Sequence, residues 1–353
     1  MRIGELSMAS VTTIESIRFY EREGLIAGPG RTDGNYRIYG DEHVQRLVFI
    51  RRCRSLDMAL DEIRGMLGFK DAPSANCGDL NAVLDEHIEI FTKQQLENTL
   101  KLATWNVNSL AVRLPQLIDW LAAHQPDVLC LQETKLTDDK FPHAALAAAG
   151  YQLQWFGQKT YNGVALISRS AATDVVKNIP GLDDPQARVI AGTVDGVRVI
   201  GVYVPNGQDV ESDKFVYKLR WLTALREWLA TEVAAHPKLV LMGDYNIAPE
   251  DRDVHDPVLW AGQVLCTPEE RAHFKGLIAL GLHDAFRLFE QPPKSWSWWD
   301  YRNLAFRKNQ GLRIDHILVS DVLRAGVTAC VIDKPTRKNE RPSDHAPVWV
   351  DLG

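Results

Sequence analysis

Short apolar runs that end in polar side chains dominate the chain beyond residue 100. Aliphatic and β-branched runs of this length predict β-strands. Six runs carry acids, amides or an imidazole where the apolar pattern stops: Asn106 and Asn108 after LATW, Gln132 and Glu133 after VLCL, Tyr203 and Asn206 in IGVYVPN, Asp244 and Asn246 in LVLMGDYN, Asp315 in RIDHIL, and Asp344 and His345 before APVWV. Strand ends are rigid, so they can hold several polar groups around one point. The pattern predicts a polar site at the edge of a sheet.

Amphipathic helices are predicted between these strands. Within residues 218–233, Leu222, Leu225 and Leu229 share one helical face. The segment Thr267-Pro268-Glu269-Glu270 has the order of an N-cap, a proline at the first helical position and a capping glutamate. Because strands outnumber helices, we predict an α/β fold of two packed sheets flanked by helices.

A change in composition divides the chain near residues 98–101. All ten tryptophans lie after Thr99, whereas the preceding part carries clustered arginines in RFYEREG and FIRRCR. Such a change marks a domain boundary. We therefore predict a first domain at residues 1–78, a helix at residues 79–98 and a second domain at residues 99–353.

Several classes of protein are disfavoured by composition. No apolar run is long enough to cross a bilayer, and MRIGELSMAS lacks the apolar core of a signal peptide, so a cytoplasmic protein without membrane contact is expected. The five cysteines are scattered and form no C-x-x-C pair, which favours reduced thiols over a disulfide framework. The formal net charge of -6 gives no global basic field for nucleic acid, although a local basic face is compatible with it.

The groups at the strand ends suit the hydrolysis of a phosphodiester. That reaction needs a cation, an activated water and help for the departing oxygen. Carboxylate and amide oxygens favour magnesium, with manganese as the alternative, over zinc. Any single Asn or Asp is more often a turn former or a cap. Glu133, Tyr203 and Asp315 are not turn residues, however, so the set as a whole favours a metal-dependent site.

A family resemblance supports this interpretation. The segments WNVNSL, LQETK, NGVALISR, VYVPNG, MGDYNIAP, WSWWDYR, GLRIDHIL and SDHAPVW resemble, in this order, those of the exonuclease III family of abasic-site endonucleases. The resemblance covers residues 100–353. It implies a four-layer α/β sandwich with the active site at one edge of two packed sheets. It also implies a magnesium-dependent hydrolase that cuts double-stranded DNA at abasic sites and trims blocked 3′ ends, a role in DNA repair.

The resemblance assigns roles to individual residues. It makes Glu133 the principal metal ligand, with Asn106, Asn108 and Asp344 nearby. Some family members carry Asp at the position of Asn108, which leaves the number of bound metals open.

The same resemblance distributes the catalytic work. Asp244 deprotonates the attacking water with help from Asn246. His345 binds the scissile phosphate, Asp344 orients its imidazole, and Asp315 assists the departing 3′ oxygen. The substrate contacts that it implies are those of Tyr203 and Asn206 with the phosphate and of Trp298 with the abasic sugar. For Trp296 and Trp299 we predict core positions.

The first part of the chain resembles a second family. MRIGEL, TTIESIRFYEREGLI and RTDGNYRIY are similar to the winged helix-turn-helix of the MerR transcription regulators, closest to the cadmium- and lead-responsive branch, and the likeness covers residues 1–98. It implies a first helix from Ile3 to Ala9 and a recognition helix capped by Thr13. The further roles that it implies are burial for Ile14 and Ile17, a DNA-facing position for Arg18 and Tyr20, and a phosphate contact for Arg37 in a wing over residues 31–39.

Three features depart from that second family. Val11 stands in the tight turn where Gly is usual, the helix at residues 79–98 is short for a dimerisation helix, and Cys77 lacks the two further cysteines of a metal sensor. The first domain is then either a working regulator or a non-sensing remnant of a gene fusion. A monomer and a weak dimer through this part both remain open.

Two alternatives compete with the repair nuclease. One is a MerR-type DNA-binding transcription regulator fused to a nuclease-fold domain that contributes only bulk. The other keeps the nuclease fold but acts on RNA, a phosphoinositide or a sphingolipid. The complete set of polar groups from Asn106 to His345 disfavours the first, and the WSWWDYR and GLRIDHIL segments disfavour the second.

Overall fold

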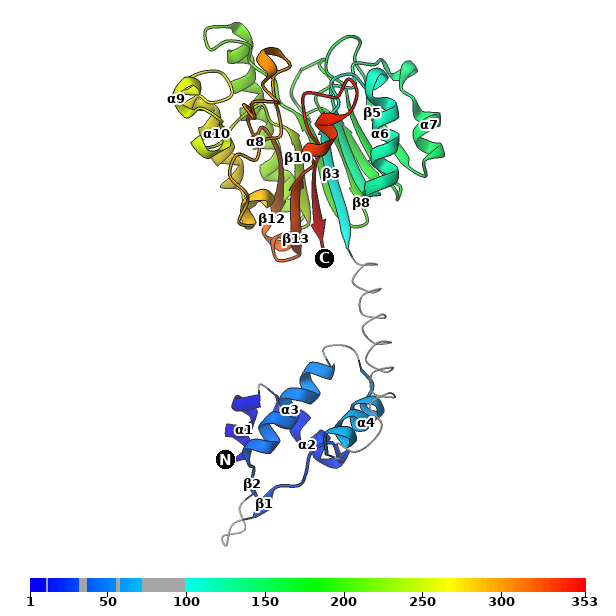
Figure 1. Cartoon of the computed structure of the whole chain (residues 1–353), viewed down its shortest axis with the longest axis vertical. Helices are drawn as coiled ribbons and strands as arrows, with labels where there is room; N and C mark the ends of the chain where they lie inside the picture. Colours follow the sequence, from blue (N-terminus) through cyan, green and yellow to red (C-terminus); the bar gives the residue numbers. More distant parts are fainter. Residues whose placement is uncertain (11, 32–36, 55–57, 72–98) are drawn as a thin grey trace. The chain divides into compact units, whose positions relative to one another are not determined.

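The computed structural model of the chain describes residues 1–10, 12–31, 37–54, 58–71 and 99–353. The chain divides into two compact units, Met1–Asn98 and Thr99–Gly353 (Figure 1). Among the described residues, no helix combines the length and the apolar character that a membrane span requires. The helix predicted at residues 79–98, together with Val11 and Cys77, lies outside the described residues.

The first unit is mainly helical. Its elements are α1 (Ile3–Ser10), α2 (Ile14–Arg22), β1 (Gly30–Arg31), β2 (Arg37–Ile38), α3 (Asp41–Arg54) and α4 (Leu60–Asp71). Thr13 caps α2 as predicted, because its Oγ1 accepts a hydrogen bond from the Ser16 backbone N–H at 3.2 Å. Ile17 is fully buried in the small core of this unit. The predicted burial of Ile14 is wrong, since this first residue of α2 lies 38% exposed.

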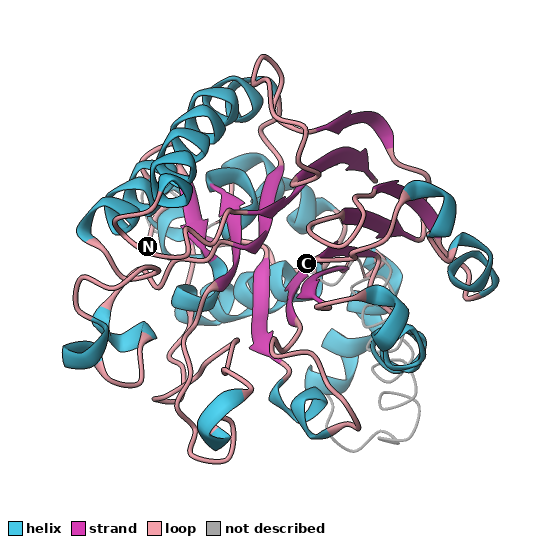
Figure 2. Cartoon of the chain, turned by 90° about the horizontal axis from the view of Figure 1, so that it is seen from above, coloured by secondary structure: helices cyan, strands magenta, loops and turns pink. Residues whose placement is uncertain are grey.

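The second unit contains two six-stranded sheets (Figure 2). The strand order of the first sheet is β11 (Leu282–Asp284), β12 (Asp315–Ser320), β10 (Leu239–Asp244), β9 (Val197–Tyr203), β8 (Val189–Val194) and β7 (Thr173–Lys177). The order of the second sheet is β13 (Val327–Ile332), β14 (Val348–Leu352), β3 (Leu100–Asn106), β4 (Val128–Gln132), β6 (Val164–Ser168) and β5 (Gln152–Phe156).

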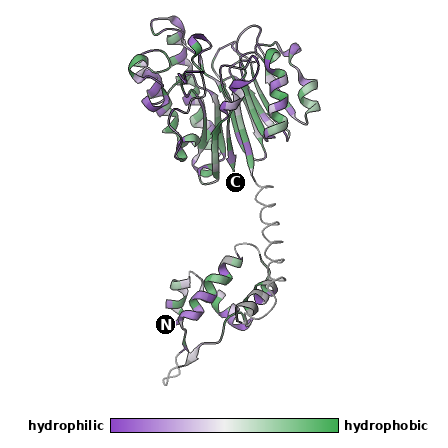
Figure 3. Ribbon diagram, in the orientation of Figure 1, coloured by the Kyte–Doolittle hydropathy of each residue, from purple (hydrophilic) through white to green (hydrophobic). Residues whose placement is uncertain are grey.

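Helices cover the outer face of each sheet. The helices of the second unit are α6 (Leu110–His124), α7 (His143–Ala148), α8 (Asp213–Ala235), α9 (Pro257–Trp260), α10 (Pro268–Ile278) and α11 (Asp321–Arg324). Helix α8 packs its predicted leucine face, with α10, on the first sheet, and α6 and α7 pack on the second. Aliphatic side chains from both sheets meet in the centre, so the strands are the apolar part of the unit (Figure 3). The four-layer α/β sandwich predicted from the resemblance is confirmed.

Strand register gathers the polar residues at one end of the sheets. Asp244 is the register partner of Tyr203 on parallel β9 and of Asp315 on antiparallel β12. In the second sheet, Asn106 stands opposite Gln132 on parallel β4. Gly243 is required for this arrangement, because a Cβ at its φ of +155° would lie 1.9 Å from the Val202 carbonyl oxygen.

The predicted capping of α10 is also present. The Thr267 side chain accepts from the Glu270 backbone N–H, and the Glu270 side chain accepts from that of Thr267, which forms a capping box with Pro268 at the first helical position.

Candidate active site

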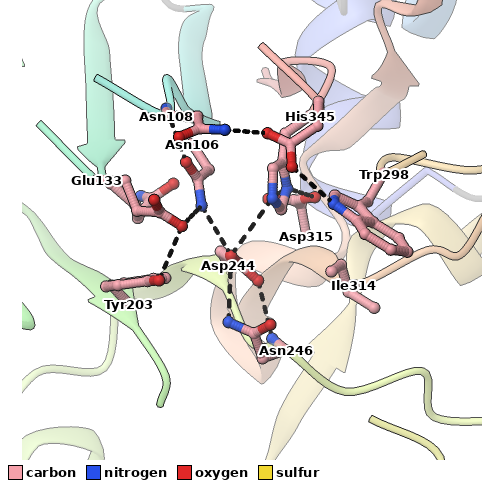
Figure 4. A network of polar contacts seen from close by, with 12 residues as sticks. Asn106, Asn108, Glu133, Tyr203, Asp244, Asn246, Trp298, Ile314, Asp315 and His345 are labelled. Carbon is pink, nitrogen blue, oxygen red and sulfur yellow. Dashed lines mark hydrogen bonds and ion pairs between the residues drawn. The ribbon is translucent and has the colours of Figure 1, made fainter. Parts of the chain in front are cut away.

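Polar side chains from six strand ends converge on one partly buried cluster (Figure 4). Gln132 does not join it, because its side chain bonds to Thr104 within the sheet. Asn106, at the end of β3, joins the two sheets through its amide, because Nδ2 donates to Glu133 Oε1 at 3.0 Å and to Asp244 Oδ2 at 2.9 Å. The Tyr203 hydroxyl donates to the same Glu133 oxygen at 2.8 Å. The strand ends therefore meet as predicted, and one amide connects the two carboxylates.

Glu133 is held in its ionised form. Lys135 lies 2.7 Å from Glu133 Oε2 and also donates to Asn108. Burial works against ionisation, but Lys135, together with the hydrogen bonds from Asn106 and Tyr203, holds the pKa of Glu133 below its usual range. Asn108, Glu133 and Lys135 all have positive φ, an uncommon conformation for such residues that concentrates at functional sites.

His345 is paired with Asp315. Both carboxylate oxygens of Asp315 lie within hydrogen-bond distance of His345 Nδ1, at 2.9 and 3.1 Å. The predicted orientation of the imidazole by Asp344 is wrong. The Asp344 carboxylate instead accepts from Asn108 Nδ2 at 2.9 Å and from Trp298 Nε1 at 3.1 Å.

The second ring nitrogen of His345, Nε2, is directed at Asp244. His345 Nε2 lies 3.7 Å from Asp244 Oδ2, and both side chains are buried. Burial alone would lower the pKa of His345, but Asp315 and Asp244 raise it to about 10, so the ring is an imidazolium near neutral pH. Burial and the neighbouring Asp315 raise the pKa of Asp244 to about 7, although His345 and Asn106 oppose this shift.

The same three groups are close enough for metal binding. Asp244, Asp315 and His345 offer ligand atoms that all lie within 4.8 Å of one another. Because both Asp315 oxygens bond to His345 Nδ1, this cluster is better described as an ion-paired imidazolium than as a set of free ligands. A buried carboxylate with a pKa near neutrality, beside a fixed cation, is suited to accept a proton from water.

Asn246 and Asn206 form the adjoining part of the site. The Asn246 backbone N–H donates to Asp244 Oδ1 at 2.9 Å, and Asn246 Nδ2 donates to Asp244 Oδ2 at 3.3 Å. Asn206 Nδ2 donates to Asn246 Oδ1 at 2.9 Å. Two amides therefore line the site beside the buried carboxylate.

Trp298 occupies the position predicted for it at the surface of the site. Its neighbours Trp296 and Trp299 are buried, as predicted, whereas Trp298 is half-buried. Its ring packs with Leu312 and Ile314, and its backbone bridges to His345. An aromatic wall therefore stands beside the imidazole of His345 (Figure 4).

Several residues around the site carried no role in the sequence interpretation. Arg188 donates from Nη1 to the Tyr203 carbonyl at 3.1 Å, and its guanidinium lies 4.8 Å from the centre of the Tyr203 ring. A groove of about 490 Å³ adjoins Tyr203 and is lined by Arg188, Lys214 and Tyr217 among others. The sequence does not indicate this basic and aromatic lining, because the residue before β8, the loop after β9 and helix α8 come together only in the folded protein.

Buried His316 was missed as well. It accepts from Arg313 through Nδ1 at 3.0 Å and donates from Nε2 to the Ile247 carbonyl at 2.9 Å. Its position directly after Asp315 in RIDHIL was the available signal.

The proposed DNA-facing residues of the first unit are arranged as follows. Arg18 is exposed on α2, and Arg37 is 54% exposed with its guanidinium 3.8 Å from Glu21. Tyr20 is half-buried against the core of the unit, so most of its ring is committed to packing.

Comparisons with known proteins give three family matches. Residues 103–345 match the model of the endonuclease/exonuclease/phosphatase family. Residues 1–70 match the MerR helix-turn-helix family of regulatory proteins, and residues 44–99 match the family described as MerR, DNA binding.

Individual relatives cover nearly the whole of the second unit. The chain is 35% identical to exodeoxyribonuclease III of Haemophilus influenzae over 266 residues, 72% of this chain and 100% of the relative. It is 51% identical to the solved 3′ phosphatase NExo of Neisseria bound to a product DNA hairpin, with a TM-score of 0.71 over 72% of this chain and 99% of that one. It is 36% identical to an AP endonuclease from Archaeoglobus fulgidus, with a TM-score of 0.69 over 71% and 98% of the two chains.

Proposed function

Because the chain belongs to the endonuclease/exonuclease/phosphatase family and is a DNA-cleaving hydrolase, we propose that it is a magnesium-dependent repair enzyme that cuts duplex DNA at abasic sites and trims blocked 3′ ends. The observation that carries the proposal is the position of Asp244. Its buried carboxylate accepts from Asn106, which also binds Glu133, and it faces the imidazolium of His345.

The residues present fit a magnesium ion. Glu133 and Asp344 supply carboxylate oxygens and Asn108 supplies an amide oxygen, the donor types that hard cations prefer. The amide nitrogen of Asn106 is turned towards Glu133, so we assign to Asn106 the orientation of that carboxylate. When bound, the ion supplies positive charge to neutralise the phosphate.

The protein groups divide the remaining work. Asp244 accepts a proton from the attacking water, and Asn246 fixes the direction of the carboxylate. The His345 imidazolium, oriented by Asp315, stabilises the charge that develops on the phosphate. Because Asp315 is paired with His345, we assign to it the orientation of the imidazole in place of the predicted role at the departing oxygen.

Phosphate binding is assigned to Tyr203 and Asn206. Burial, followed by the charge of Glu133, raises the pKa of Tyr203 well above its usual value, so its hydroxyl keeps its proton. That proton is donated to Glu133 here, and rotation of the O–H away from Glu133 lets it donate to a phosphate oxygen instead. Asn206 presents its amide beside Asn246.

The substrate class follows from the aromatic wall. The ring of half-buried Trp298, which packs on the buried cluster that contains Leu312 and Ile314, offers an apolar surface suited to a sugar that has lost its base. The similar NExo structure holds a DNA product and is named a 3′ phosphatase, and the similar Archaeoglobus protein is named an AP endonuclease. Both names support activity at abasic sites and at 3′ ends.

The first unit adds a second proposal. The two MerR family matches support DNA binding by this unit, and the exposed Arg18 and Arg37 supply phosphate contacts. We place the protein in the cytoplasm and propose a monomer or a weak dimer through this unit. The alternative for this unit is a MerR-type DNA-binding transcription regulator fused to the nuclease-fold unit.

Cleavage of labelled duplexes tests the main proposal. One duplex carries a single abasic analogue, a second carries a 3′ phosphate, and an intact duplex is the control, each with magnesium or with EDTA. Strand incision and phosphate release that need magnesium and disappear in Asp244→Asn are expected. Full activity in EDTA, or abasic incision by Asp244→Asn near the wild-type rate, contradicts the proposal.

A further inference from the structure

A fully buried ion pair lies behind the two amides of the site. Lys218 on α8 and Glu270 on α10 both have no exposed surface, and Lys218 Nζ lies 2.5 Å from Glu270 Oε1. Burying two charges is costly unless every donor and acceptor is bonded, and a well-packed apolar pair is often as stable or more stable. Stability alone therefore does not account for these two residues.

The ammonium of Lys218 connects the loops that carry Asn206 and Asn246. It donates to the Asn206 carbonyl at 3.1 Å, to the Asn246 carbonyl at 2.6 Å and to Glu270. An ammonium has three N–H donors, so all are used. On the other side of the same loops, the Asn206 and Asn246 side chains bond to each other at 2.9 Å. The separation of the two amides is thus fixed from both sides.

Glu270 fixes the Lys218 ammonium in turn. Its Oε1 also accepts from the Leu265 backbone N–H at 3.0 Å, and its Oε2 accepts from the Thr267 N–H and hydroxyl at 3.0 and 2.8 Å. The carboxylate is therefore held by the start of α10. Gly207 leaves room for the Lys218 side chain, since a Cβ there would lie 3.2 Å from Lys218 Cδ and at a φ of +94°.

We propose that Lys218 is a positioning residue for DNA cleavage. Its ammonium ties the loops after β9 and β10 together and so holds Asn206 and Asn246 at the spacing that phosphate and water require. Glu270 keeps the ammonium in place. An apolar side chain fills the same space but cannot bond to two carbonyls, so the cation serves the geometry of the site. The inference rests on the proposed roles of Asn206 and Asn246.

Three variants separate positioning from stability. Lys218→Met keeps the length of the side chain and removes its donors, and we expect kcat to fall about 10- to 100-fold with little change in KM. Glu270→Gln keeps an oxygen that accepts from the ammonium, which also retains its two carbonyl contacts, so kcat should stay within about threefold of wild type despite lower stability. The double variant leaves no unpaired buried charge, and it carries the test if Lys218→Met does not fold.

A matched control is available on β9. Arg198 is also buried, bonds to Glu232 at 2.7 Å and donates to the Asp174 carbonyl at 2.7 Å. It lies about 16 Å along the strand from Tyr203. Arg198→Met should lower the melting temperature without changing kcat. It therefore measures how much stability the chain loses when a buried cation remote from the site is removed, for comparison with Lys218→Met.

A mutant cycle identifies the route of the effect. In a chain that already carries Asn206→Ala and Asn246→Ala, Lys218→Met should lower kcat less than about twofold further. An unchanged kcat in Lys218→Met, or an equal decrease in both backgrounds, overturns the inference. If the two alanine substitutions themselves leave kcat unchanged, the proposed roles of the amides fail first. That outcome is distinct from failure of Lys218 alone.

Discussion

Replacing Asp315 by Asn, and separately Asp344 by Asn, tests which carboxylate holds the imidazole of His345 for its proposed catalytic role. Asp315 and Asp244, acting against burial, raise the pKa of His345 from 6.5 to about 10. At 1.36 kcal/mol per pKa unit this corresponds to about 5 kcal/mol in favour of the imidazolium. Asp315 lies 2.9 Å from Nδ1 and Asp244 lies 3.7 Å from Nε2. At least half of the preference, roughly 2 to 3 kcal/mol or on the order of 100-fold, therefore belongs to Asp315.

Asp315→Asn should accordingly lower the cleavage rate about 100-fold or more at every magnesium concentration, because the amide also presents an N–H to His345. Asp344→Asn leaves the imidazole pair intact but replaces a proposed metal ligand. Its defect should be a higher magnesium requirement, with the rate at saturating metal within about tenfold of wild type.

Single-turnover cleavage at saturating DNA, measured over a magnesium titration near neutral pH, separates the two outcomes. Thermal melting and DNA affinity of both variants serve as controls for folding and binding. If Asp315→Asn is rescued by magnesium while Asp344→Asn is not, the assignment of the two carboxylates is reversed and the reasoning fails.

Three further predictions concern the metal, acid stability and the first unit. Glu133→Ala should raise the magnesium concentration for half-maximal cleavage at least about tenfold, and an unchanged requirement excludes Glu133 as a ligand. Burial, then Arg313, lowers the pKa of His316 to about 4. The neutral ring therefore stabilises the fold fully above the unfolded-state pKa of 6.5, and this contribution disappears as the pH falls towards 4. Urea unfolding followed by tryptophan fluorescence reports only on the second unit and measures this effect. Between about pH 7.5 and about pH 5, the free energy of unfolding of wild type should fall by roughly 2 kcal/mol more than that of His316→Gln. Equal decreases in the two proteins contradict this prediction. A chain that begins at Thr99 should cleave saturating DNA at the full rate. Its affinity for intact duplex should depend less on salt, with the slope of log affinity against log salt concentration smaller by roughly 0.9 for each phosphate that the first unit neutralises in the full chain. An equal slope shows that the first unit binds no phosphate.

Local sequence patterns were sufficient for the strand ends and for the cap of α10. An apolar run followed by polar residues, or Thr-Pro-x-Glu before a helix, is decided within a few residues of the chain. The same locality explains why the four edge strands, β5, β7, β11 and β13, were not predicted, whereas β8 was missed although it is a buried interior strand. Strand β7, for example, is an edge strand with exposed residues, so its sequence lacks the continuous apolar run of a central strand.

Pairings across the fold were beyond local patterns. Asp344 precedes His345 in sequence, yet Asp315 binds the imidazole. Lys218 precedes Leu222 by four residues and so shares the leucine face of its helix, and its burial there depends on Glu270 more than fifty residues later. Such choices depend on how the sheets and helices pack, which the spacing of residues along the chain does not encode.

Strand β3 also bears on how the chain was assembled. Leu100 is paired with Leu352 at one end of the strand, and Asn106 reaches the site at the other end. Six residue steps separate the two ends, about 20 Å of extended chain. Sequence added before Thr99 or after Gly353 therefore joins the nuclease at neighbouring points remote from its chemistry. Recombination at either point can therefore add a domain without displacing the residues of the candidate active site, and a domain moved from one terminus to the other would disturb them as little.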